Sequence, residues 1–151
     1  MNNLIRSLLL CFLLAGHNAL AQVTQVEEKL LLEMMNTLLE AAKPQDMATL
    51  ERHMAEDFEQ ISEAKDGPDP MDYEAYVADL NEWFYQMEFY DYKVRDTEVF
   101  RLPEGAGYGL KAHITDMYFI DGFYEREDHT QTWHIRNTPD GFKVFKLVLH
   151  D

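Results

Sequence analysis

The sequence predicts an α+β domain in which about three N-terminal helices precede an antiparallel sheet. Apolar residues recur at helical spacing over the first part of the chain, and after Phe89 they alternate with polar residues at the period of a strand. The dipeptide Asp121-Gly122, typical of a two-residue hairpin turn, separates two of these alternating segments. Helices followed by a meander of consecutive strands are typical of the α+β class.

The composition predicts one packed domain and excludes several partners. The chain has 151 residues, of which 46% are hydrophobic, so it can bury a single core. Its formal net charge of −15 argues against nucleic acid and against an anionic membrane surface, because both bind clustered lysines and arginines. Cys11 is the only cysteine, and no phosphate-binding or dinucleotide motif is present, so we expect no cofactor.

Residues 1–21 have the features of a signal peptide. Arg6 supplies a positive charge, residues 8–15 form an apolar run, and Ala19-Leu20-Ala21 fits a cleavage site. A membrane-spanning helix needs about 20 apolar residues, so no membrane span is expected after cleavage. We therefore expect one domain over residues 22–151, periplasmic or secreted and without disulfides, with a buried N-terminal helix as the alternative for the first segment.

Three helices are expected in this domain. The first covers residues 23–41, and its apolar stripe consists of Val23, Val26, Leu30, Met34, Leu38 and Ala41. Asp46 is a suitable N-cap for a short second helix. The third helix begins with Asp69 as its cap and Pro70 in its first turn. Its apolar residues are Tyr73, Tyr76, Val77, Leu80, Trp83, Phe84 and Met87, a spacing that favours core packing over an aromatic cofactor site.

A short strand at residues 58–61 and four later strands complete the domain. The first of the four begins at Tyr90 and continues through Phe100 after a bulge near Asp96. The others cover residues 110–120, 123–135 and 142–150. Turns are expected at Pro103-Glu104-Gly105-Ala106-Gly107 and at Thr138-Pro139-Asp140-Gly141.

The two-residue turn fixes the register of the central hairpin and therefore the composition of each face. It pairs Leu110 with Trp133 and Asp116 with Glu127. The apolar residues expected on the inner face are Leu110, Ala112, Ile114, Tyr118, Ile120, Phe123, Trp133, Ile135, Val144 and Val148. The polar residues expected among them are Asp116, Glu127, His129, Gln131, Lys146 and His150. These polar groups lie either at an open, wet end of the sheet or around a cavity.

If the cavity exists, its polar groups could perform acid–base chemistry. Neighbouring Asp116 and Glu127 would raise the pKa of at least one carboxyl, and His129 could act as acid or base near neutral pH. These three residues are the catalytic candidates. The remaining residues expected to line a ligand pocket are Trp83, Tyr118, Gln131, Trp133 and Lys146.

The outer face of the sheet is also expected to carry apolar residues. They are Met117, Phe119, Tyr124, Phe145, Leu147 and Leu149. With only three helices available to cover the sheet, a second copy of the chain is the simplest cover for this face. We therefore expect a homodimer that forms through the sheet.

The order of elements resembles the nuclear transport factor 2-like superfamily, especially its SnoaL-like and ketosteroid-isomerase-like branches. The matching segments are the first and third helices, residues 46–58, and residues 130–144 at the end of the meander, where Phe142 replaces a more common tryptophan. The resemblance implies a cone-shaped, curved antiparallel sheet wrapped around the helices, an interior pocket and, in many members, a dimer.

The catalytic residues of a ketosteroid-isomerase-like site do not match this sequence. The positions of its tyrosine, its basic aspartate and its protonated aspartate are occupied by Leu38, Ser62 and Trp133, and Glu63 follows Ser62. An enolate would therefore lack its usual stabilising donors. The resemblance implies the fold more strongly than any reaction.

A metal site is not expected. Asp66, Asp69 and Asp72 do not follow the ligand pattern of a calcium loop. A zinc site formed by His129 and His150, with Asp116 or Glu127 nearby, is a minor alternative.

Three functions stay open at this point. The first is an exported domain that binds a small apolar or amphipathic molecule or a protein partner, without a recognisable catalytic set. The second is a pocket enzyme, a lyase, isomerase or hydrolase. The third is an accessory protein whose acidic surface binds a basic partner. A cavity with room for a ligand would favour the first two over a pure interaction role.

Overall fold

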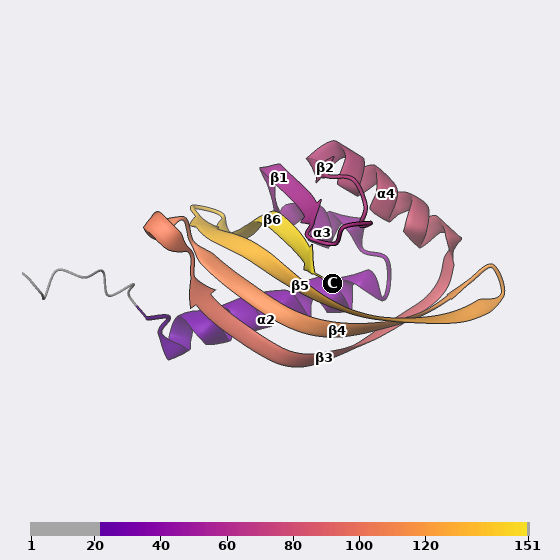
Figure 1. The fold of residues 1–151 in the computed structure, drawn as a ribbon, viewed down its shortest axis with the longest axis horizontal. Coiled ribbons are helices and arrows are strands. Elements are labelled where there is room, and N and C mark those ends of the chain that lie inside the picture. Colours follow the sequence, from indigo (N-terminus) through magenta and orange to yellow (C-terminus); the bar gives the residue numbers. More distant parts are fainter. Residues whose placement is uncertain (1–21, 151) are drawn as a thin grey trace, which may run out of the picture.

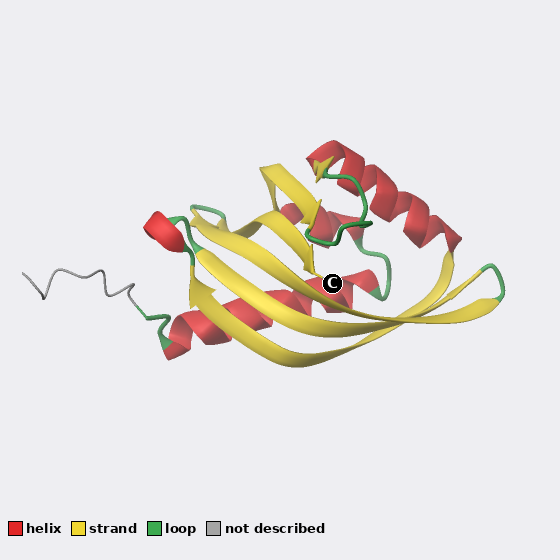
Figure 2. Cartoon of the chain, in the orientation of Figure 1, coloured by secondary structure: helices red, strands yellow, loops and turns green. Residues whose placement is uncertain are grey.

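The computed structural model describes residues 22–150, which form three α-helices and a six-stranded sheet (Figures 1 and 2). The predicted signal peptide lies outside the described residues. The elements in chain order are α2 (Gln25–Ala42), α3 (Met47–Arg52), β1 (Met54–Ser62), β2 (Met71–Asp72), α4 (Tyr73–Gln86), β3 (Met87–Arg101), the 3-10 turn η1 (Pro103–Gly105), β4 (Tyr108–Ile120), β5 (Phe123–Thr138) and β6 (Gly141–His150). The α+β class is confirmed.

The sheet has the strand order β2-β1-β6-β5-β4-β3 and is mixed, not purely antiparallel. The meander from β3 to β6 is antiparallel as predicted, but β1 runs parallel to β6. The long strands β3, β4 and β5 curve across one side of α2, while α3 and α4 lie near β1 and β2 (Figure 1). The helices and the concave face of the sheet therefore enclose the core. None of the described helices is long and apolar enough to cross a membrane.

Helix α2 buries only part of the predicted stripe: Met34 and Ala41 are buried as predicted, but Leu31 and Met35 are buried in place of Val26 and Leu30. Leu31 and Met35 are 0% and 3% exposed, whereas Val26 and Leu30 are 69% and 44% exposed. The buried positions follow the spacing of three and four residues that brings one helix face against the sheet. The sequence alone does not decide between the two stripes, because leucine and methionine occur all around this helix.

The first turn of α2 is fixed to the sheet through Glu27. Its carboxylate caps the helix together with Thr24 and accepts hydrogen bonds from Arg101 and from the Tyr108 hydroxyl, both at 2.7 Å. The Thr24 backbone and Tyr108 lower the pKa of Glu27 from 4.5 to about 2. The ionised carboxylate therefore links helix and sheet across neutral pH.

Replacing Glu27 with glutamine is expected to lower the free energy of unfolding at pH 7, because Arg101 loses its charged partner. The depressed pKa means that this stabilisation is present above about pH 4.5 and is lost as the pH falls through 2. Urea denaturation of both proteins should therefore give curves that converge on acidification. Glu28→Gln, at an exposed position of the same turn, is the control and should change little. A difference that persists at pH 2 would contradict the assignment.

Helix α4 begins later than predicted. Asp72 caps it by accepting a hydrogen bond from the Ala75 amide at 2.9 Å, whereas Asp69 and Pro70 lie before the helix. Asp72 pairs with Glu59 in β1, which keeps the chain extended up to the cap. The prediction that Asp69 caps this helix is therefore wrong.

The central hairpin has the predicted register. Asp121 and Gly122 have φ angles of 51° and 81°, as a two-residue hairpin turn of this kind requires. Leu110 pairs with Trp133 and Asp116 with Glu127. The bulge near Asp96 is present too, as a register shift between Arg95 and Glu98. The inner face of β4 and β5 was therefore predictable from one turn.

A second bulge changes the face of most of β6. Ile135 pairs with Val144, but the preceding His134 pairs with Lys146, so Phe145 is an extra residue. Beyond this point the alternation is reversed. Leu147 and Leu149 lie on the inner face opposite Trp133 and Gln131, and the outer face receives Lys146, Val148 and His150. The prediction that Lys146 lines the interior is therefore wrong, and so is the outer placement of the two leucines.

A candidate ligand pocket with a carboxylate–imidazole pair

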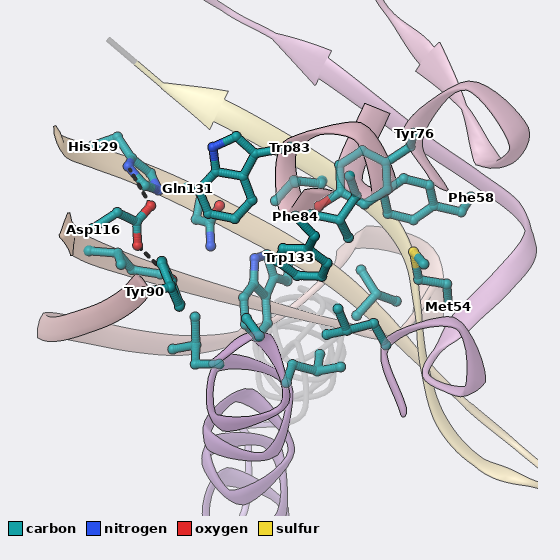
Figure 3. Close-up of a pocket in the computed structure, with 18 residues that line it drawn as sticks. Met54, Phe58, Tyr76, Trp83, Phe84, Tyr90, Asp116, His129, Gln131 and Trp133 are labelled. Carbon is teal, nitrogen blue, oxygen red and sulfur yellow. Dashed lines mark hydrogen bonds and ion pairs between the residues drawn. The ribbon is translucent and has the colours of Figure 1, made fainter. Parts of the chain in front are cut away.

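A cavity of about 190 Å³ lies between the helices and the inner face of the sheet. Its inner end is apolar and includes Met54, Phe58 and Ile114, which are 8%, 3% and 1% exposed. Its other end carries Asp116 and His129, whose side chains are 18% and 28% exposed. In Figure 3, Asp116 and His129 lie at one end of the lining side chains, and Met54 and Phe58 lie at the other. The cavity thus has an apolar, buried inner end and a polar, more accessible outer end.

The hairpin register places the polar groups. Inward-facing residues of β4 and β5 stand opposite each other, so Asp116 lies diagonally across from His129. Their Oδ2 and Nδ1 atoms are 3.6 Å apart. Tyr90 on β3 donates a hydrogen bond of 2.7 Å to Oδ1 of Asp116 (Figure 3). One hydroxyl and one imidazole therefore face the same carboxylate.

Burial dominates the electrostatics of Asp116. Desolvation raises its pKa above the usual 3.8, and the charge of Glu127 acts in the same direction. The hydrogen bond from Tyr90 and the charge of His129 act in the opposite direction and are outweighed. The sequence predicted a raised pKa for Asp116 or Glu127, and the pKa of Asp116 is raised.

Aromatic side chains surround the polar end. The ring of Trp83 on α4 makes T-shaped contacts with the rings of Tyr90 and Tyr118. The Trp83 centroid lies 5.6 Å from that of Tyr90 and 5.5 Å from that of Tyr118. Tyr118 donates a hydrogen bond of 2.7 Å to Glu127. Burial raises the pKa of both tyrosines, so they remain neutral hydrogen-bond donors. Trp133 lies between this wall and the apolar end (Figure 3).

The structure brings together most of the predicted site residues. The cavity is lined by Asp116, His129, Gln131, Trp133 and Trp83. Two predicted residues do not line it: Tyr118 packs against Trp83 and donates a hydrogen bond to Glu127, whose side chain is exposed.

Two predicted residues are on the other face of the sheet. Lys146 forms an ion pair with Glu59, and His150 contacts Glu63 and Thr132. His129 and His150 are therefore on opposite faces, and the alternative zinc site that paired them is wrong. Within residues 22–150, no group of three or more histidine, cysteine, aspartate or glutamate side chains could hold a metal ion.

Sequence reasoning missed several lining residues, most notably Tyr90. Its alternation with Tyr92 and Val94 indicated a strand, but its contact with Asp116 depends on the register between β3 and β4, which no short turn fixes. Leu38 does line the cavity, at the position where the ketosteroid-isomerase-like pattern has its tyrosine.

Comparison with known proteins identifies the fold. No protein-family model matches the sequence, and no curated protein matches it. Among solved structures, a proposed aromatic ring hydroxylase from Novosphingobium aromaticivorans superimposes with a TM-score of 0.76 at 16% identity, over 85% of this chain and 91% of that chain. A proposed dehydratase of the NTF2-like family from Streptomyces avermitilis superimposes with a TM-score of 0.71 at 14% identity, over 84% of this chain and 97% of that chain.

A hexachlorocyclohexane dehydrochlorinase, LinA type 2, gives a TM-score of 0.68 at 10% identity, over 82% of this chain and 84% of that chain. The TM-scores establish the fold. At identities of 10% to 16%, the reactions of these proteins are not assigned to this chain. The described residues have the fold of the nuclear transport factor 2-like superfamily, as the sequence resemblance implied.

Proposed function

We propose that this protein is an exported domain that binds a small, mainly apolar cyclic molecule in its interior pocket. The observation that carries the proposal is the cavity of about 190 Å³ with an apolar inner end and a single polar end. A cavity of about 150 Å³ lined by apolar side chains can hold benzene, so this one suits a ligand of one or two rings. Room for a ligand favours this function over a pure interaction role.

Two further observations support the proposal. The predicted signal peptide in residues 1–21 supports export to the periplasm or the medium. Two of the similar proteins are named for chemistry on an aromatic ring and on hexachlorocyclohexane, which supports a cyclic ligand here. The homodimer stays a prediction, and the half-exposed Phe89 and Tyr124 on the outer face are consistent with it.

Replacing Ala42 with phenylalanine is expected to fill the cavity and weaken ligand binding at least about tenfold, since Ala42 lines it from the end of α2. Both tryptophans of the chain, Trp83 and Trp133, line the cavity, so their fluorescence should report its occupancy. Titration with benzyl alcohol and with toluene, followed by fluorescence and calorimetry, measures the effect.

The control is Ala48→Phe, the same substitution at an exposed position of α3. It should leave both affinities unchanged. If neither probe changes the tryptophan fluorescence of the unmodified protein, the binding function is wrong.

A second candidate function is proton transfer within the same pocket. The specific observation is the Asp116–His129 pair, 3.6 Å apart at the edge of an apolar cavity. A partly desolvated carboxylate is a stronger base than one in water, and the half-exposed imidazole beside it can pass a proton to solvent. Asp116 would take the proton, His129 would relay it, and Tyr90 would orient the carboxylate.

A further inference from the structure

We infer that the ligand of this pocket is a monocation, an ammonium group or a heteroaromatic cation on an apolar body, and that its charged end lies against Asp116. This inference rests on the proposed binding function and adds the charge and the orientation of the ligand. It follows from the free oxygen of Asp116, from the absence of positive side chains in the lining and from the aromatic wall.

Asp116 has one carboxylate oxygen available to a ligand. Oδ1 accepts the hydrogen bond from Tyr90. Oδ2 has no donor within hydrogen-bond distance among the described residues, and the nearest basic atom is Nδ1 of His129 at 3.6 Å. A charged oxygen at the edge of an apolar cavity is costly unless a donor or a cation satisfies it. An ammonium N–H group supplies both.

The permanently charged side chains around the cavity are all negative. No lysine or arginine lines it along the part of the chain that the structure describes. The charged groups that act on the pKa of Asp116 are His129 and Glu127, and an imidazole carries a charge only when it is protonated. A neutral ligand brings no cationic partner to Asp116, and an anion is repelled by its carboxylate. The net charge of −15 adds long-range attraction for cations.

The aromatic wall suits a cation as well. Trp83 stands against Tyr90 and Tyr118, and both hydroxyls donate to carboxylates (Figure 3 shows Trp83 and Tyr90). A cation within about 6 Å of an aromatic face is attracted by the ring, and more strongly when it is desolvated. The apolar inner end at Phe58 then receives the body of the ligand.

The test compares three probes of similar shape and different charge: benzylammonium, benzyl alcohol and benzoate. Calorimetry at pH 7.5 and low salt should give benzylammonium an affinity at least about tenfold higher than that of benzyl alcohol, with benzoate weakest. In Asp116→Asn the preference should disappear while the affinity for benzyl alcohol stays within about twofold. Equal binding of the cation and the alcohol would overturn the inference and leave the binding function intact.

Two variants separate local from general effects. Glu125→Gln removes the same charge from an exposed position of β5 and should keep the preference. If it abolishes the preference as fully as Asp116→Asn does, the net charge is responsible and the assignment to Asp116 is overturned. His129→Gln removes the imidazole, so that its protonation cannot contribute to a pH dependence of binding.

A second test measures the binding of benzylammonium and benzyl alcohol by the His129→Gln variant as a function of pH. This test keeps Asp116 and therefore remains valid even if Asp116→Asn does not fold. The titratable groups near Asp116 in that variant are Tyr90 from β3, Tyr118 from β4, Glu127 from β5 and Tyr76 from α4. Burial raises the pKa of Tyr76 to about 12, so this tyrosine stays neutral. The preference for benzylammonium should fall on acidification as Asp116 is protonated, and a preference that is constant down to pH 4 would overturn the inference. If no probe binds at all, the proposed binding function fails instead.

Discussion

Replacement of Asp116 with asparagine is expected to slow proton abstraction from 5-nitrobenzisoxazole by about 100- to 10,000-fold. This flat bicyclic probe suits a cavity of about 190 Å³. The carboxylate takes the ring C–H proton, the electron pair of that bond forms the nitrile, and the N–O bond breaks to release a nitrophenolate. The absorbance of the nitrophenolate measures the rate. Asparagine keeps the shape and can still accept the Tyr90 hydrogen bond, but it cannot take the proton.

The pH profile of this reaction provides a readout that a structural role would not give. The rate should rise with pH as Asp116 ionises, and the inflection should lie above 3.8 because burial raises the pKa of this carboxyl. Glu125→Gln, at an exposed position, should leave the rate unchanged. An unchanged rate in Asp116→Asn would show that proton transfer is not a function of this pocket, while ligand binding would be unaffected.

Replacement of Ile135 with alanine is expected to lower the free energy of unfolding by about 3 kcal/mol. Ile135 is 0% exposed and belongs to the core cluster that joins α2 to the sheet. Truncation removes apolar contacts and leaves a cavity that a closely packed interior fills only in part. Urea denaturation monitored by circular dichroism measures the change.

Val26→Ala is the matched control for this stability measurement. Val26 is 69% exposed on α2, so the loss of its methyl groups should change the free energy of unfolding by less than about 0.5 kcal/mol. Equal effects of the two substitutions would contradict the position of Ile135 in the core.

The sequence alone predicts which side chains face the interior wherever a short turn fixes the register of two strands. The Asp121-Gly122 turn determines the pairing of Asp116 with Glu127, and with it the inward direction of His129 and Trp133. The central half of the candidate site was therefore predictable without coordinates.

The remaining parts of the site depend on contacts between distant segments. The parallel pairing of β1 with β6 brings Met54 and Phe58 to the cavity, and no local pattern encodes a pairing across more than 80 residues. Between the β3–β4 connection and Tyr90, the register shifts at an irregularity between Arg95 and Glu98. The start of α4 at Asp72 depends on pairing with β1. Long-range pairing decided each of these positions.

The extra residue at Phe145 makes the last strand sensitive to its length. A deletion at this position would restore simple alternation, so each later side chain would exchange faces: Leu147 would leave the interior and Lys146 would enter it. Point substitutions in this segment alter one contact at a time, whereas the loss of a codon would invert the whole end of the chain. Relatives that share this interior should therefore vary freely in the side chain at Phe145 while conserving the number of residues between Gly141 and His150.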